Sequence, residues 1–450
     1  MTSFLLCLSA FAISFIAGRR SLVAGLATVL GTGYVYGITR ANLPETFSHL
    51  IFDAGVLGLY FAQLMRRVSR EERIRIQRLW LWVVVLIAWP VLLFLIPIQD
   101  PMIQLVGLRG NAFLVPFLLI GAQLDRKSIY ILALWLAGLN LIAFVFACAE
   151  FFLGVPQFFP YRAGVTDIIY KSNDLMGFTA FRIPATFTSA HAYAGMMVMT
   201  LPFLVGACVQ EQRRVWHGYV LASALAVSIV GIFMSAARTH FIALLILLLV
   251  TTFSGQLKRS SWIGWVVMLV GIGWVVSSDE RLQRFTTLQD TEFLSARLAG
   301  SVSLSFWELV GAYPLGNGMG GGGTSIPYFL QDLIKNPIGF ESEYARIVLE
   351  QGIPGLFLWV AFIVWVLTRR TLHRLDTWYL GRQLAWFACA AYFATGLIGI
   401  GLFTSVPQTC LLLLTTGWIA VRQPFDTDSP PATLRRQSRE GEIGARHFGR

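Results

Sequence analysis

Long uninterrupted apolar runs constrain the fold of this chain more than any other feature of its sequence. Leu79–Ile98 and Ser128–Ala149 each supply the roughly 20 mostly apolar residues that a helix needs to cross a lipid bilayer. The 450 residues are 56% hydrophobic and 13% charged, whereas soluble domains average about 45–50% and about 25%. This composition excludes an ordinary soluble protein and a disordered or fibrous chain. The sequence therefore predicts an all-α fold, a polytopic membrane helix bundle.

Thirteen apolar stretches are candidate spans, and the four shortest need flanking residues to cross a bilayer. One of these four can instead be re-entrant, so we expect about 12–13 transmembrane helices. The candidate spans are Phe4–Ala17, Ser21–Ile38, Leu50–Met65, Leu79–Ile98, Ala112–Leu124, Ser128–Ala149, Ala192–Val209, Val215–Ala237, Phe241–Phe253, Trp262–Ser277, Ile353–Thr368, Trp386–Phe403 and Thr409–Val421. The start of the chain lacks a basic region and a small-residue cleavage site before Arg19, which favours a retained first helix over a signal peptide.

The distribution of basic residues predicts which ends of the spans face the cytoplasm. The net charge of +11 raises the question of nucleic acid binding, but topology explains the surplus better, and no nucleic acid partner is expected. Short cytoplasmic loops hold most Lys and Arg in membrane proteins. With the C-terminal tail inside and thirteen spans, 24 of the 35 Lys and Arg lie inside and 11 outside. The pattern predicts a multi-pass protein whose tail is cytoplasmic.

This topology divides the chain into a transmembrane domain, residues 1–421, and a tail, residues 422–450. It leaves two long segments outside, a first loop at 153–189 and a larger loop at 278–342, both rich in Gly and Pro. Long loops in compact folds are often functional. The polar, Pro- and Ser-containing tail is predicted to be disordered and cytoplasmic.

Arg238 is the first candidate for chemistry, because it lies between two apolar runs at the predicted outer face, in the stretch Ser235-Ala-Ala-Arg-Thr-His240. Charged residues at the membrane are costly unless paired, and many are functional. Arg182 and Arg297 are predicted to lie at the same face. A guanidinium binds phosphate through two parallel hydrogen bonds, so three of them suggest a diphosphate site. Snorkelling to the headgroups, or pairing with loop carboxylates, are the structural alternatives.

The end of the larger loop carries further candidates. The glycines of Tyr313-Pro-Leu-Gly-Asn-Gly-Met-Gly-Gly-Gly-Gly323 let the backbone approach a helix or partner closely, but no P-loop Gly-Lys-Ser/Thr follows. Glu341 precedes a predicted helix and can accept a proton from a sugar hydroxyl, with a solvated loop residue as the alternative. Glu343, Arg346 and Glu350 have the spacing of a helix ion-pair ladder, which is the favoured interpretation for the first two.

The remaining polar signals are weaker. His191 and His240 lie at the outer side, either as satisfied polar groups near the headgroups or as substrate contacts. The five cysteines lie in apolar stretches without CxxC spacing, and no histidine pair has metal-ligand spacing. We therefore expect no disulfide, no metal and no cofactor. The loop aromatics Phe158, Phe159 and Tyr161 are candidates for stacking on a glycan.

Four stretches together resemble the O-antigen ligase/polymerase family of bacterial inner-membrane glycosyltransferases. They are Arg182-Ile-Pro-Ala-Thr-Phe187, Ser235-Ala-Ala-Arg238, Arg297-Leu298 followed by Tyr313-Pro-Leu-Gly-Asn-Gly318, and Glu343-Tyr-Ala-Arg-Ile-Val-Leu-Glu-Gln-Gly-Ile-Pro-Gly-Leu356. Each stretch alone is a weak match to the family, and the order of the four stretches is more specific than any one of them. The Gly that precedes Thr-Phe in the family is Ala185 here.

The resemblance implies a metal-independent transfer of a glycan from undecaprenyl diphosphate at the periplasmic face of the inner membrane. By motif position, Arg238 and Arg297 would hold the diphosphate, and Glu341 would be the catalytic base where ligases carry a histidine. Arg182, His191, His240, Glu343 and Tyr344 would contact substrate. The expected partners are the lipid-linked glycan, an acceptor glycan and the bilayer, with a chain-length regulator as a further candidate.

Four roles stay open at this point. A polymerase is favoured, because Glu341 replaces the ligase histidine. A ligase would transfer the same donor to a different acceptor. A flippase or transporter for lipid-linked glycans would need polar residues along a path through the bilayer, and the nearest candidates, Asp53 and Glu150, lie close to the predicted ends of spans. An inactive scaffold of a synthesis complex is a further alternative.

Overall fold

The computed structural model of the protein describes residues 1–43, 45–161, 166–173, 179–210, 214–253, 304–323, 326–338, 342–369, 371, 376–399 and 401–421. The predicted span Trp262–Ser277, the predicted site residues Arg297 and Glu341, and the tail 422–450 lie outside these ranges.

The described residues confirm the all-α class. Nine helical segments among them are long and apolar enough to cross a membrane, and two further apolar helices are shorter. The helices are α1 Thr2–Arg20, α2 Leu22–Asn42, α3 Ile51–Leu64, α4 Arg70–Phe94, α5 Pro101–Ala112, α6 Phe117–Gln123, α7 Arg126–Leu153, α8 Ala190–Cys208, α9 Val215–Met234, α10 Arg238–Phe253, α13 Leu304–Ala312, α14 Glu343–Thr368, α15 Tyr379–Thr395 and α16 Gln408–Ala420. A short antiparallel pair, β1 Lys171–Asn173 and β2 Thr179–Phe181, lies in the first long loop.

Polar residues at the starts of the helices set several of these boundaries. Ser69 and Glu72 form a reciprocal capping box at the start of α4. Asp125 accepts a hydrogen bond from the backbone N–H of Ser128 and caps α7, and Ser189 caps α8 in the same way. These caps satisfy backbone donors at the points where the apolar runs begin.

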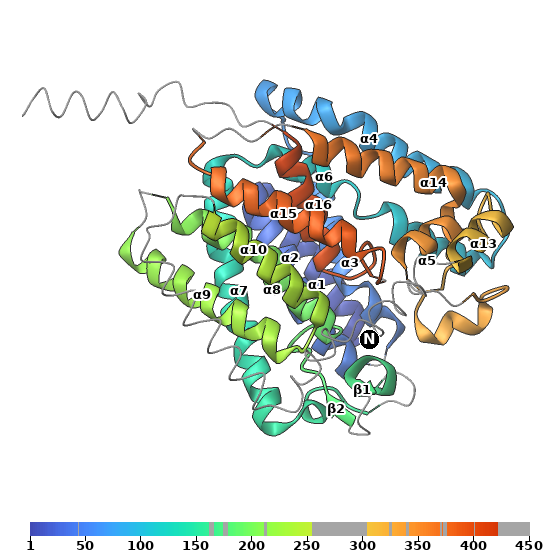
Figure 1. The fold of residues 1–450 in the computed structure, drawn as a ribbon, viewed down its shortest axis with the longest axis horizontal. Helices are drawn as coiled ribbons and strands as arrows, with labels where there is room; N and C mark the ends of the chain where they lie inside the picture. The colour runs from blue at the N-terminus through green and yellow to red at the C-terminus, as the bar shows by residue number, and fades with distance from the viewer. Residues whose placement is uncertain are drawn as a thin grey trace, which may run out of the picture.

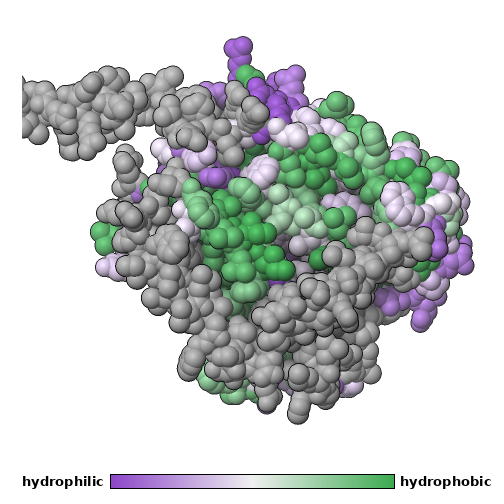
Figure 2. All heavy atoms as spheres, viewed as in Figure 1, coloured by the Kyte–Doolittle hydropathy of each residue, from purple (hydrophilic) through white to green (hydrophobic). Residues whose placement is uncertain are grey.

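The helices pack in two groups with a shared middle (Figure 1). Helices α4 and α14 lie together on one side, and α9 packs against α7 and α8 on the other. Between them, α16 packs against α6, and α15 packs against α8. Apolar residues cover much of the described surface in view, while polar residues gather toward its upper and right edges (Figure 2). Large exposed hydrophobic side chains, such as Leu64 and Phe152, suit a surface that faces lipid.

Contacts between helix ends agree with the predicted alternation of the spans. We call the helix ends that are predicted to be cytoplasmic the inner end of the bundle. There the guanidinium of Arg19 donates to the carbonyl oxygen of Met65, so the ends of α1 and α3 meet. An ion pair of 3.4 Å joins Arg126 at the start of α7 to Asp376 before α15.

The opposite set of ends, the outer end, is joined in the same manner. The amino group of Met1 pairs with Glu45 at 3.2 Å. The side chain of Asn42 at the end of α2 donates to the carbonyl oxygen of Phe158, just after α7. Each of these contacts joins two positions that the charge pattern assigns to the same face.

Some predicted boundaries were wrong. The predicted span Trp386–Phe403 is replaced by α15, which ends at Thr395 and is followed by a non-helical segment containing Gly396, Gly399 and Gly401. Helix α4 begins at Arg70, nine residues before the predicted Leu79. Helix α14 begins at Glu343 and confirms the helix predicted after Glu341, although Gly352 breaks its backbone geometry with φ 68°. The predicted span Ala112–Leu124 belongs to a broken pair, α5 and α6, interrupted at residues 113–116. Hydropathy alone misses these features because buried pairing and glycine conformations set them.

Candidate functional site

The outer end of the bundle gathers polar side chains from three separate parts of the chain. Arg182 precedes α8, His191 lies in its first turn, and His240 lies in the first turn of α10. A guanidinium nitrogen of Arg182 is 3.2 Å from Nε2 of His191. The rings of His191 and His240 have centroids 5.9 Å apart. Three side chains that the sequence predicted as substrate contacts therefore form one chain of contacts.

The end of α15 completes this group, which we call the outer cluster: Arg182, His191, Arg238, His240 and Tyr392. The ring of Tyr392, in the last turn of α15, lies 5.7 Å from that of His240. Arg238 is the first residue of α10, two positions before His240, and its side chain is partly buried. Local sequence patterns do not predict Tyr392, because its contact with His240 joins residues more than 150 positions apart.

A tight turn places Arg238 at the start of α10. Helix α9 ends at Met234, and Ala236 then takes φ 52°, in the left-handed region. The chain thus reverses within three residues, which matches the short connection expected from the sequence. Arg238 is thus the first residue of α10, whose N-terminal amides also favour an anion.

The segment that carries Arg182 is held on a backbone cradle. Gly37 of α2 lies so close that a Cβ atom there would be 2.0 Å from the carbonyl carbon of Phe187. The backbone N–H of Ile38 donates to the carbonyl oxygen of Thr186 at 3.0 Å. Ala185 takes φ 51°, a left-handed conformation that glycine adopts more readily. This is the position at which the resembled family motif has Gly.

Glu343 and Tyr344 lie at the start of α14, against the same end of α15. The hydroxyl of Tyr344 donates to the carbonyl oxygen of Phe393 at 2.8 Å. Glu343 is fully buried, accepts the backbone N–H of Gly401, and pairs with Arg346 at 2.8 Å. In this structure Glu343 is not open to a ligand, and its contacts are those of the ion-pair ladder. Its predicted substrate role and that of Tyr344 stay predictions.

The ladder continues into a buried polar network. Arg346 also pairs with Glu350 at 2.5 Å, and all three charged side chains are at most 1% exposed. Asn111 of α5 donates to Glu350 and accepts from Arg346 and from Gln351. Asn111 therefore ties α5 to the buried ion pairs of α14.

The glycine-rich segment packs on this network. Gly316, Gly318, Gly320 and Gly323 have φ between 74° and 90°. A Cβ on Gly322 would lie 3.0 Å from side-chain atoms of both Arg346 and Glu350. The segment is therefore a close backbone contact with helices, one of the two uses predicted from its sequence.

Several other residues that the sequence singles out pack against, or pair with, neighbouring side chains. Phe159 is buried against Tyr170, with ring centroids 4.9 Å apart, and Phe158 is partly buried against Phe146. Tyr161 is 61% exposed, and the ammonium group of Lys171 lies over its ring, 5.6 Å from the centroid. Asp53 forms a bidentate ion pair with Arg109.

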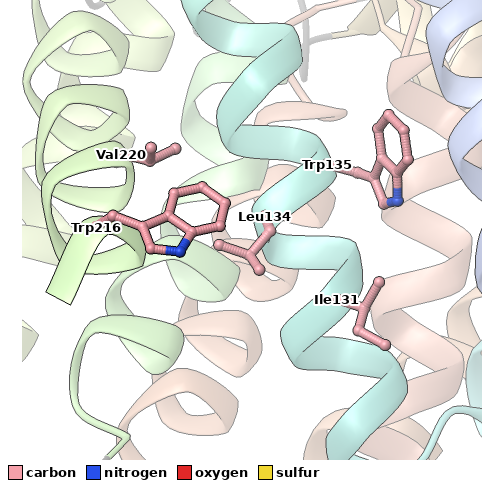
Figure 3. A pocket seen from close by; sticks show the side chains of 5 residues that line it. All are labelled: Ile131, Leu134, Trp135, Trp216 and Val220. Atoms are coloured by element: carbon pink, nitrogen blue, oxygen red, sulfur yellow. The ribbon is translucent and has the colours of Figure 1, made fainter. Parts of the chain in front are cut away.

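A small pocket lies elsewhere (Figure 3). It is lined by Ile131, Leu134 and Trp135 of α7 and by Trp216 and Val220 of α9, near the inner ends of both helices. Its lining is apolar, which suits a lipid-facing surface better than a site for a charged substrate. Within the described ranges, no group of three or more His, Cys, Asp or Glu is arranged to hold a metal ion.

Comparisons with known proteins do not identify a family. No family model matches the chain, and a search of curated proteins finds no significant match.

Proposed function

We propose that this multi-pass membrane protein transfers an oligosaccharide from a lipid diphosphate carrier, acting at the outer end of its helix bundle. The carrier is undecaprenyl diphosphate, and the membrane is the bacterial inner membrane, with the outer end in the periplasm. The favoured reaction is polymerisation, in which the acceptor is a second lipid-linked unit. A ligase reaction differs only in the acceptor.

The observation that carries the proposal is the outer cluster. Arg182, His191 and His240 come from separate segments and meet at one end of helices that are apolar enough to span a bilayer. Arg238 begins the helix that carries His240. Cationic and neutral donors at headgroup depth suit a lipid-linked diphosphate, whose charge lies at that depth and whose glycan lies beyond it.

The chemistry is a single displacement at the anomeric carbon of the donor sugar. An acceptor hydroxyl oxygen forms the new bond to this carbon, and the carbon–oxygen bond to the diphosphate breaks with its electron pair leaving on the diphosphate. Arg238 and Arg297 stabilise the negative charge that grows on the leaving group. Glu341 takes the proton of the attacking hydroxyl. One displacement inverts the anomeric configuration.

Replacement of Arg238 tests the proposal. Arg238→Ala should abolish polymer formation in cells while the protein remains in the membrane, because the leaving diphosphate loses charge stabilisation. Arg214→Ala is the matched control, since Arg214 is an exposed arginine at the inner end, before α9. The control should form polymer at the wild-type level. Wild-type polymer from Arg238→Ala would contradict the proposed role.

A further inference from the structure

Glu150 is a buried carboxyl group that the proposed reaction does not use. It lies in the last turn of α7 and is 1% exposed. Its Oε2 accepts a hydrogen bond of 2.9 Å from the backbone N–H of Ala185. Burying a carboxyl group costs free energy, so a buried carboxyl group is expected to have a specific structural or functional role.

The accepted N–H belongs to the residue at which the chain turns. Ala185 is fully buried and takes the left-handed φ of 51°. A buried backbone N–H in a turn has no ladder partner and needs an acceptor from elsewhere. Glu150 supplies this acceptor, and so stabilises a conformation that an alanine adopts less readily than a glycine.

Neighbouring contacts fix the two sides of this turn, and across its centre the backbone N–H of Phe187 donates to the carbonyl oxygen of Pro184 at 3.0 Å. On one side, the backbone N–H of Arg182 donates to the carbonyl oxygen of Tyr170. On the other side, Phe187 packs between Tyr34 and Tyr193, with ring centroids 4.9 and 5.7 Å away. Glu150 is the side chain that the structure shows bonded to the turn between these two anchors.

We infer that Glu150 is a positioning residue: by holding the amide of Ala185 it fixes the turn that aims Arg182 at His191. Arg182 lies three residues before Ala185, and His191 lies six residues after it. A change in the backbone direction at Ala185 therefore changes the separation of the two side chains. The catalytic consequence rests on the proposed function, but the geometric role does not.

Two substitutions separate the hydrogen bond from the charge. Glu150→Gln keeps an acceptor oxygen of the same reach, while Glu150→Leu keeps the bulk and removes the acceptor. Gln104→Leu is the matched control, because Gln104 is a buried polar residue of α5 whose side chain donates to the carbonyl oxygens of Phe94 and Ile96, away from the turn. It costs stability without touching Ala185.

The test is a cross-link that does not depend on activity. In a protein whose five native cysteines are alanine, Arg182 and His191 are replaced by cysteine and joined with a short bifunctional maleimide in membranes. Glu150→Leu should lower the cross-linking yield severalfold, while Glu150→Gln and Gln104→Leu should cross-link like the parent. A parental yield from Glu150→Leu, or an equal loss from Gln104→Leu, would overturn the inference.

Turnover on the lipid-linked donor then separates the two proposals. With cysteines only at native positions, Glu150→Leu should raise the KM for the donor severalfold, and Glu150→Gln should restore it. If the cross-link responds as expected but the parent protein shows no turnover, the positioning role stands and the proposed function fails.

Discussion

At the scale of single residues, the charged side chains of α14 show how position decides what an ion pair does. Arg346 lies fully buried between Glu343 and Glu350, whereas Arg66 pairs with Glu72 while remaining 34% exposed. Removing one partner of a buried pair leaves an uncompensated charge and costs about 3–5 kcal/mol. An exposed pair contributes about 0–1 kcal/mol.

These residues give a stability prediction with a built-in control. Arg346→Gln should lower the free energy of unfolding by about 3–5 kcal/mol, because two buried carboxylates lose their shared cation. Arg66→Gln should change it by no more than about 1 kcal/mol. Thermal unfolding of the purified protein in detergent measures both. Equal midpoints for the two variants would show that the buried network does not stabilise the fold.

At the scale of elements, the fit between α2 and the segment before α8 positions the outer cluster. Gly37 lies against the backbone of Phe187 and Thr188, so no side chain can be accommodated there without movement. Gly138 of α7 has no atom within 4 Å of the place where a Cβ would be. Gly37 is therefore required for close packing, whereas Gly138 is not.

Alanine substitution separates these roles. Gly37→Ala should destabilise the protein by about 1–3 kcal/mol and reduce turnover, since the new methyl group displaces the segment that carries Arg182. Gly138→Ala should raise stability by roughly 0.5–1 kcal/mol, because alanine favours the helix and meets no neighbour. Unfolding midpoints and turnover rates of both variants check this. A Gly37→Ala protein as stable and active as the parent would refute the close fit.

At the scale of the whole molecule, the contacts between helix ends and the basic residues describe the same two faces. The account requires that Tyr161, which is exposed near the outer end, and Arg214, exposed at the inner end, lie on opposite sides of the membrane. The excess of Lys and Arg predicts that the inner end lies in the cytoplasm.

Cysteine labelling tests this topology. In a protein without native cysteines, a membrane-impermeant maleimide should label Tyr161→Cys in cells with a permeabilised outer envelope and an intact inner membrane. Arg214→Cys should react only after the inner membrane is opened. The reverse pattern would place the outer cluster in the cytoplasm and rule out a periplasmic reaction.

Much of this architecture follows from the sequence, because hydropathy reports spans and basic residues report their orientation. The start of α14 also follows, because Glu343, Arg346 and Glu350 have the spacing of a helix ion-pair ladder, but their burial does not, since they look too polar to be buried until their mutual pairing is known. The end of α15 is missed for the opposite reason, because the apolar run continues past Thr395 into a glycine-rich segment that is not helical.

The candidate site likewise contains some residues that the sequence predicts and others that it does not. Arg182, His191, Arg238 and His240 stand out in the sequence because they are polar residues beside apolar runs. Tyr392 and the contact between Glu150 and Ala185 depend on packing between distant segments, which local patterns do not encode. Local patterns can therefore predict which polar residues lie at one end of the bundle, but not the residues that hold them in place.

The most direct measurement is turnover by the purified protein supplied with lipid-diphosphate-linked repeat units from its host, without added metal or nucleotide. The account predicts a ladder of longer lipid-linked products, which Arg238→Ala eliminates. Transfer only after a second acceptor is added would identify a ligase. No transfer under either condition, with the lipid-linked donor still bound, would contradict the central claim and favour a transporter or a scaffold.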